Sequence, residues 1–238
     1  MSGEVALVSG AASGIGRATA MRLAARGASV GLFDRDPAGM AVVAQMIAKA
    51  GGTAHSFEAD IASSASVAEA VHKIVDICGG LDTVVSCAGI LKTGLIYEID
   101  ETDWLQTIAV NLTGTFLLAR HTIPQLIKRG GGSFVAISSD AGVQGASGYA
   151  AYCASKHGVN GLIRCLALDH GRAGVRSNAV CPGFVDTPMA TREFATAPSG
   201  TKEFYQHTVP LGRFARPDCG FRRNPPRYSD LMSPTIPI

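Results

Sequence analysis

The sequence lacks a strong excess of charge of either sign. Its 21 lysines and arginines against 19 aspartates and glutamates give a formal net charge of +2, and the last twenty residues supply that surplus. A protein that binds a phosphate backbone needs clustered basic side chains, and the rest of the chain has no basic stripe. We therefore expect no nucleic acid among the partners of this protein.

Metal-ligand motifs and long apolar runs are also absent. The six cysteines are scattered with no C-x-x-C pair and the six histidines form no H-E-x-x-H cluster, so we predict no metal site. No apolar run approaches the ~18 residues of a membrane-spanning helix, and the first residues do not resemble a signal peptide. The sequence predicts a cytoplasmic protein that does not contact a membrane.

Short apolar segments alternate with longer segments of helical period along most of the chain. Repeated β-α units of this kind feed a parallel sheet, so we predict an α/β fold with a three-layer, doubly wound parallel sheet (a Rossmann fold) in one catalytic domain, residues 1–218. The expected strands are residues 5–9, 29–33, 53–58, 81–86, 133–138 and 175–181. The expected helices lie near residues 15–27, 37–50, 64–78, 101–129 and 150–173.

Residues 219–238 differ in composition from everything before them. This segment contains no alanine and no valine, and it has four prolines. Proline fixes φ and removes a hydrogen-bond donor, so we expect an atypical tail that continues neither the helical nor the strand pattern.

A glycine-rich turn follows the first expected strand and reads Gly10-Ala11-Ala12-Ser13-Gly14-Ile15-Gly16. Glycines let a diphosphate approach the backbone N–H groups at a helix N-terminus. Asp34, at the end of the second strand, is placed to accept hydrogen bonds from the adenosine ribose and to repel a 2′-phosphate, which predicts NAD as the cofactor. Arg35 is the neighbour that could soften this preference. Alternatively, residues 34–37 only cap the next helix.

A tyrosine and a lysine share one helix face in Tyr152-Cys153-Ala154-Ser155-Lys156. Ser139 follows the strand at 133–138, at the carboxyl end where parallel sheets bind ligands. Hydride transfer at a carbinol carbon requires a proton to move at the oxygen. A phenol has a pKa near ~10, and a neighbouring lysine cation lowers it. Without further motifs, an exposed pair with no function would be the commoner interpretation.

These motifs together resemble the short-chain dehydrogenase/reductase family from residue 3 to about residue 218. The spacing G-x-x-x-G-x-G, the segment Ser86-Cys87-Ala88-Gly89 and the motif Y-x-A-S-K carry the resemblance. Serine and cysteine stand where the family commonly has two asparagines. The expected last helix and seventh strand of the family are missing from the tail.

The resemblance implies roles for four catalytic residues. Tyr152 would exchange the proton, Lys156 would also bind the nicotinamide ribose, and Ser139 would hold the substrate oxygen. Asn111 would anchor a water that relays protons to Lys156, although an asparagine that bends a packed helix is the alternative. Cys153 and Ser155 are interpreted as helix filling, with side chains directed away from the Tyr152 and Lys156 face.

The resemblance also implies the cofactor contacts. Asp60 and Ile61 would contact the adenine, with a helix cap as the alternative, and the loop after Pro182-Gly183 would cover the nicotinamide. Residues 184–213 form a long connection, as substrate lids do. The complete predicted cofactor-binding set is Gly10, Ser13, Gly14, Ile15, Gly16, Asp34, Asp60, Ile61, Ala88, Gly89, Tyr152, Lys156, Pro182, Gly183, Val185 and Thr187.

The sequence therefore predicts an NAD-dependent oxidoreductase that acts on a small secondary alcohol or ketone. The resemblance implies a homodimer or homotetramer that uses the helices near 101–129 and 150–173. Two alternatives remain open. One is a cofactor-binding homologue that the altered tail has left without turnover. The other is an NADPH-dependent 3-ketoacyl-type reductase, which would normally have a basic residue at the position of Ser13 or Asp34.

Overall fold

Six parallel strands form one sheet in the order β3-β2-β1-β4-β5-β6. The structure is a computed structural model that describes residues 3–197 and 199–218. The strands are β1 (Val5–Ser9), β2 (Ser29–Asp34), β3 (Thr53–Glu58), β4 (Thr83–Ser86), β5 (Gly132–Ile137) and β6 (Val175–Val180). The predicted α/β class and parallel sheet are confirmed, and every strand end lies within two residues of its expected position.

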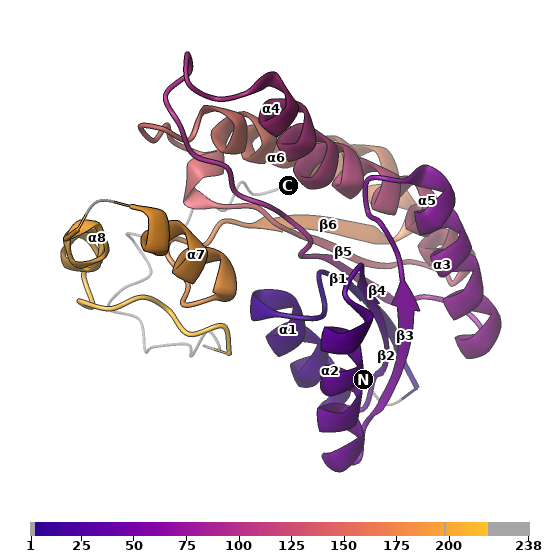
Figure 1. The fold of residues 1–238 in the computed structure, drawn as a ribbon. Coiled ribbons are helices and arrows are strands. Elements are labelled where there is room, and N and C mark those ends of the chain that lie inside the picture. Colours follow the sequence, from indigo (N-terminus) through magenta and orange to yellow (C-terminus); the bar gives the residue numbers. More distant parts are fainter. Residues whose placement is uncertain (1–2, 198, 219–238) are drawn as a thin grey trace.

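Helices cover both faces of this sheet (Figure 1). On one face lie α1 (Gly14–Ala24) and α2 (Pro37–Lys49), and on the other lie α3 (Ser64–Cys78), α5 (Gly114–Lys128) and α6 (Ala150–His170). Neighbouring strand residues contribute to opposite faces, so Leu7 and Val8 belong to two different core clusters. Strands buried on both faces explain the continuous apolar runs in the sequence.

The helix expected at 101–129 is divided in three. It consists of α4 (Glu101–Ile108), a π-helical turn (Ala109–Thr113) and α5. Asn111 lies in the π turn and is 1% exposed. Single π turns inside α-helices often mark functional positions. Two short 3-10 turns, Asp140–Gly142 and Gly171–Ala173, flank α6.

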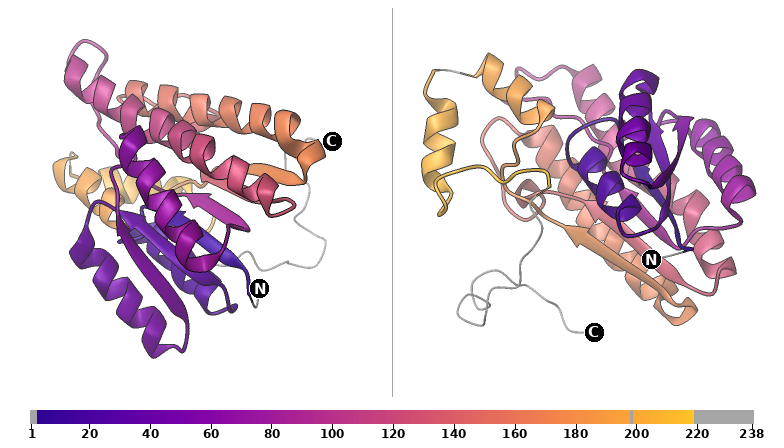
Figure 2. Two further views of the ribbon diagram at one scale, coloured as in Figure 1. Left: turned by 90° about the vertical axis from the view of Figure 1, so that its right-hand side faces the viewer. Right: turned by 90° about the horizontal axis from the view of Figure 1, so that it is seen from below.

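Residues 184–216, which we call the lid, stand beside the carboxyl ends of the strands (Figures 1 and 2). The sequence analysis predicted a long connection here and no helix, but the segment contains α7 (Pro188–Thr196) and α8 (Thr201–Thr208). Stacked aromatic rings hold the lid together: Phe214 lies 5.2 Å from Phe184 and 5.4 Å from Phe194 between ring centroids. Thr187 caps α7, with its Oγ1 accepting from the Ala190 N–H at 3.3 Å, and Pro188 follows as the first helical residue.

The tail at 219–238 lies outside the described residues, so the absence of the family's last helix and seventh strand from it stays a prediction. In the part of the chain that is described, β6 forms one edge of the sheet, and no helix is both long and apolar enough to cross a membrane. The domain boundary at residue 218 stays a prediction.

Candidate active site

Two adjoining cavities lie at the carboxyl ends of the strands. The Tyr152 cavity is lined by residues from β5, α6 and the lid, and the Asp34 cavity by the glycine-rich turn and the ends of β2 and β3. Ligands of open parallel sheets bind where the strand order reverses, here between β1 and β4. The cavities share a common wall of Ile15, Cys87, Gly89, Thr187 and Met189.

Every residue of the predicted cofactor-binding set lines at least one of these cavities. Around the Asp34 cavity lie Gly10, Ser13, Gly14, Ile15, Gly16, Asp34, Asp60, Ile61, Ala88, Gly89 and Thr187. Around the Tyr152 cavity lie Tyr152, Lys156, Pro182, Gly183 and Val185, together with Ser139. The structure thus brings these residues together along one continuous wall.

Close backbone packing explains the glycines of the turn after β1. Gly10 has φ +67°, and a Cβ on it would lie 2.8 Å from the Ala88 nitrogen. A Cβ on Gly16 would lie 2.0 Å from the Gly10 carbonyl oxygen. Ser13 precedes α1 in an extended conformation and makes no side-chain cap, so its hydroxyl does not occupy the helix N-terminus. The turn presents backbone N–H groups that suit a diphosphate.

Asp34 accepts hydrogen bonds from this turn and from the residue before α2, but it is not the N-cap of that helix. Its Oδ2 accepts a hydrogen bond from the Ala12 N–H at 2.9 Å, and its Oδ1 accepts from the Asp36 N–H at 3.1 Å. Asp36 caps α2 by accepting from the Gly39 N–H at 2.9 Å. A carboxylate offers about four acceptor sites, so Asp34, which lines the cavity, keeps acceptor capacity beyond these two bonds. The capping alternative therefore applies to Asp36 and not to Asp34.

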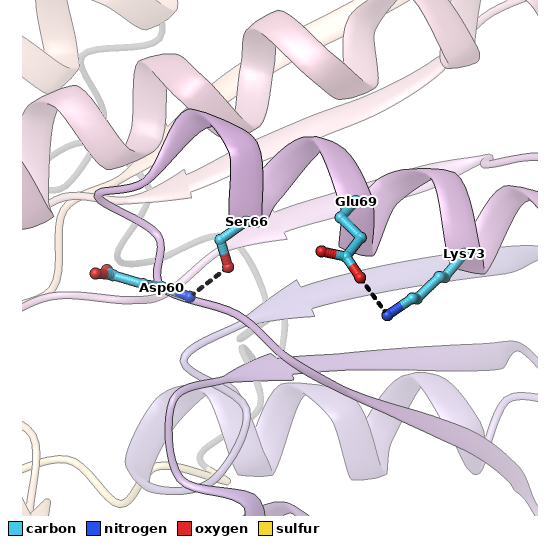
Figure 3. A network of polar contacts seen from close by, with 4 residues as sticks. All are labelled: Asp60, Ser66, Glu69 and Lys73. Carbon is cyan, nitrogen blue, oxygen red and sulfur yellow. Dashed lines mark hydrogen bonds and ion pairs between the residues drawn. The ribbon is translucent and has the colours of Figure 1, made fainter.

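Asp60 stabilises the turn before α3 (Figure 3). Its backbone N–H donates to Ser66 Oγ at 3.0 Å, and its carboxylate accepts from the Ala62 N–H at 2.9 Å. Ser63 is the actual N-cap of α3, so the helix-cap alternative for Asp60 is wrong. Figure 3 also shows the solvent-exposed ion pair of Glu69 and Lys73 on α3, which contributes little to stability.

Ser139, Tyr152 and Lys156 converge in the Tyr152 cavity. The Lys156 Nζ donates to the Ile137 carbonyl at 2.8 Å and lies 5.5 Å from the centroid of the Tyr152 ring. Ser139 Oγ donates to Asp140 Oδ1 at 2.8 Å and accepts from the Ala141 N–H at 3.1 Å. A phenol, an ammonium and a hydroxyl therefore face one space at the end of β5.

Burial dominates the protonation of this group. It raises the pKa of Tyr152 to about 12, and the neighbouring Ser139 hydroxyl acts in the opposite direction. Burial also lowers the pKa of Lys156 to about 8. The expectation that Lys156 lowers the pKa of Tyr152 is therefore wrong for the protein alone. The physical reason is that loss of water disfavours the phenolate and the ammonium alike.

Asn111 lies outside both cavities and connects the elements around them. Its Nδ2 donates to the Ile90 carbonyl and to Ser155 Oγ, both at 3.0 Å, and its Oδ1 accepts from the Ile90 N–H at 2.8 Å. Ser155 in turn donates to the Tyr152 carbonyl at 2.7 Å. The interpretation of Ser155 as helix filling is wrong, because this fully buried hydroxyl joins α6 to the π turn.

Hydroxyl groups hold the segment after β4, and two of them, those of Ser9 and Thr115, were not predicted from the sequence. The N–H groups of Cys87 and Ala88 both donate to Ser9 Oγ, at 3.1 and 3.3 Å, and Ser86 Oγ lies 3.2 Å from Thr115 Oγ1. These contacts organise the segment in which serine and cysteine replace the family's asparagines. Burial raises the pKa of the Cys87 thiol to about 12, so this thiol is neutral.

Val185 is anchored by a β-bridge to Ala215. The bridge uses the carbonyl of Phe184 and the N–H of Asp186, at 3.0 and 2.8 Å. Neighbouring residues of an extended segment direct their polar backbone groups to opposite sides. The N–H and C=O of Val185 itself therefore point away from Ala215.

Comparison with known proteins decides the family. The family model described as short chain dehydrogenase matches residues 4–198. This chain belongs to the short-chain dehydrogenase family. It is 36% identical to D-threitol dehydrogenase of Mycolicibacterium smegmatis over 92% of this chain and 83% of that protein. It is 34% identical to 3-oxoacyl-(acyl-carrier-protein) reductase of Thermotoga maritima over 92% and 87% of the two chains.

A solved structure agrees with the sequence relatives. The actinorhodin polyketide ketoreductase with NADPH superposes with a TM-score of 0.85 at 35% identity, covering 90% of this chain and 86% of that one. These similarities establish an oxidoreductase family that acts on CH–OH groups with a nicotinamide cofactor.

Proposed function

We propose that this protein transfers a hydride between NAD and a small secondary alcohol or ketone, with Tyr152 as the acid and base. The observation that carries the proposal is the shared wall of the two cavities. It joins the Ser139, Tyr152 and Lys156 cluster to the glycine-rich turn and Asp34. The glycine contacts described above leave backbone N–H groups where a diphosphate fits, so the residues present suit a dinucleotide.

Each residue has a distinct task in this proposal. The bound nicotinamide supplies or accepts the hydride. In the reducing direction, the neutral Tyr152 phenol donates its proton to the carbonyl oxygen, and Ser139 donates a hydrogen bond that stabilises negative charge there. Lys156 holds the nicotinamide ribose and adds positive charge near the phenol. Asn111 positions Lys156 and Tyr152 through Ser155, and anchors a water on the proton path.

Asp34 supports NAD as the cofactor. A carboxylate at the end of β2 accepts hydrogen bonds from ribose hydroxyls and repels a 2′-phosphate. A second candidate, an NADPH-dependent reductase, draws support from Arg35 and Arg192, which line the same cavity. The actinorhodin ketoreductase, structurally similar to this chain, also holds NADPH.

Turnover with a panel of ketones, followed by the absorbance of NADH or NADPH, tests both candidates. We expect faster turnover with NADH, and a larger rise in unfolding temperature with NADH than with NADPH. An Asp34→Ala variant should lose this difference. Faster turnover of the wild-type protein with NADPH would exclude the first candidate. Binding of either nucleotide with no turnover of any substrate would support the cofactor-binding homologue.

We also propose a homodimer or homotetramer. The apolar side chains Leu105, Phe116 and Leu168 of α4, α5 and α6 are exposed, which supports contact between copies along these helices. The mass of the protein in solution, measured by light scattering, tests this assembly.

A further inference from the structure

Helix α7 places a carboxylate in the Tyr152 cavity. Glu193 lines this cavity together with Met189 and Ala190 of the same helix. Residues one turn apart share a helix face, so this face of α7 is the lid's contribution to the cavity wall. Arg192, the adjacent residue, lines the Asp34 cavity instead.

The Glu193 carboxylate has one hydrogen-bond donor across the cavity. The Tyr149 hydroxyl donates to its Oε1, and Tyr149 immediately precedes α6. Within the described residues, no lysine, arginine or histidine forms an ion pair with Glu193. Burial raises the pKa of its carboxyl to about 7, which is the expected result when a carboxylate loses water without gaining a cation.

The other acidic side chain of the Tyr152 cavity is already engaged. Asp140 accepts hydrogen bonds from the Ser139 hydroxyl and the Ala141 N–H, both at 2.8 Å. Apolar side chains form much of the wall near the lid, including Leu91 and Phe184. Apart from the hydrogen bond from Tyr149, Glu193 is therefore an acceptor with free capacity, and the proton transfer at Tyr152 does not use it.

We propose that Glu193 accepts a hydrogen bond from a second hydroxyl of the substrate, so that the preferred substrates are diols, polyols or hydroxyketones. This inference rests on the proposed oxidoreductase function and names the substrate class of the same site. A hydroxyl fits better than an ammonium group, because Lys156 already lines this cavity and a second cation would be repelled. A substrate carboxylate would be repelled by Glu193 itself.

Matched substrate pairs test the proposal. Each pair consists of a hydroxyketone and the ketone in which a methyl group replaces the hydroxyl, with the hydroxyl one, two or three carbons from the carbonyl. For the best-placed hydroxyl, kcat/KM at about pH 8, where the Glu193 carboxyl is mostly ionised, should be at least about tenfold higher than for its partner, as a hydrogen bond to a charged acceptor implies. The aminoketone of the same length is a third comparator. A ratio near one for every pair, or a preference for the aminoketone, would overturn the proposal.

Variants distinguish a substrate contact of Glu193 from a purely structural hydrogen bond between α7 and the start of α6. Glu193→Met, which keeps the length and removes the acceptor, should bring the ratio within about twofold of one. Tyr149→Phe removes the same internal hydrogen bond and keeps the carboxylate, so its ratio should stay at least as high as in the wild type. If the contact between Glu193 and Tyr149 only holds α7 against α6, both variants should behave alike, and each should lower kcat/KM equally for the two substrates of a pair. Glu203→Gln, on the exposed face of α8, is the matched control and should leave the ratio unchanged.

A binding measurement distinguishes failure of this inference from failure of the proposed function. If no variant turns over any substrate, the oxidoreductase proposal fails on its own. The rise in unfolding temperature with NADH plus hydroxyketone is then compared with that for NADH plus the methyl partner. A larger rise with the hydroxyketone that Glu193→Met abolishes supports the inference, and equal rises overturn it.

Discussion

The carboxyl edge of the sheet and the lid build opposite walls of one cavity in different ways. At the sheet edge, Lys156 and Ser155 are buried and bonded to backbone carbonyls of β5 and α6. The lid is held by its own aromatic rings and by the bridge from Val185 to Ala215. Large apolar side chains of the lid, such as Phe204 and Leu211, are exposed. The side chains at the sheet edge are therefore held in fixed positions, whereas the lid is held mainly by contacts within itself.

This difference assigns chemistry and substrate choice to different regions. Groups that move a proton must be held to within a fraction of an ångström, and residues locked by packing and backbone hydrogen bonds meet that demand. Segments with few buried contacts open at lower free energy, which suits the entry of substrate. Substitutions at the sheet edge should therefore affect all substrates alike, and substitutions in the lid should affect them selectively.

The largest expected effect is that of Tyr152→Phe at the sheet edge. Removal of the phenolic hydroxyl should lower kcat roughly 10²- to 10⁴-fold for every substrate, the usual contribution of general acid and base catalysis. NADH should still raise the unfolding temperature, because the ring and the Asp34 cavity are unchanged. Comparable kcat values for the variant and the wild type would show that another group moves the proton.

The sequence predicted the sheet edge far better than the lid, and the physical reason lies in local constraint. Gly10 and Gly16 have no room for a Cβ, and α6 fixes the spacing of Tyr152 and Lys156, so both patterns are visible in the sequence. The roles of Ser155 and Glu193 depend on partners 44 residues away in each case. No local pattern encodes such contacts. The helix-start signals of α7, Thr187 followed by Pro188, are present in the sequence, but the sequence analysis predicted Thr187 only as a cofactor contact.

Replacement of Asn111 by leucine should lower the stability of the protein. The substitution leaves the Ile90 N–H and C=O without their side-chain partner and removes one of the two hydrogen bonds of the Ser155 hydroxyl. The free energy of unfolding should therefore fall by on the order of 3 kcal/mol. Urea unfolding measures this loss. Ser155→Ala is the control, with a loss of about 1 kcal/mol. Equal stability of Asn111→Leu and the wild type would mean that the π turn is held by other contacts.

Lys156→Met should have an effect of opposite sign on stability. Burial lowers the pKa of Lys156 from 10.5 to about 8, so at pH 7 the folded protein holds an ammonium in an unfavourable site. The variant should be more stable than the wild type by about 1 kcal/mol at pH 7, although it loses the bond to Ile137. It should also have lost turnover.

The difference in stability between Lys156→Met and the wild type should depend on pH. Between pH 8 and 10.5 the unfolded chain binds more protons at Lys156 than the folded protein does, so wild-type stability rises with pH in this window. The advantage of the methionine variant should therefore shrink as the pH approaches 10.5. A variant less stable than the wild type at pH 7 would show that the Ile137 bond outweighs desolvation.

The smallest effect is expected in the lid, at Glu193→Gln. Burial raises the pKa of Glu193 from 4.5 to about 7, so the folded protein binds more protons than the unfolded chain between these values. Stability of the wild type should therefore fall as the pH rises from 4.5 to 7, and stay at the lower level above pH 7. The neutral glutamine removes this dependence, so the variant should gain in unfolding temperature relative to the wild type at pH 8 but not at pH 5.

The effect of Glu193→Gln should be small because Glu193 is only half-buried, so that solvent screens its charge. A local measurement in the lid is therefore needed beside the unfolding temperature of the whole protein. Hydrogen exchange of the α7 amides reports on the lid directly. We expect the substitution to change the exchange rates of the α7 amides and to leave those of the β5 amides unchanged, because Glu193 belongs to the lid and not to the sheet edge.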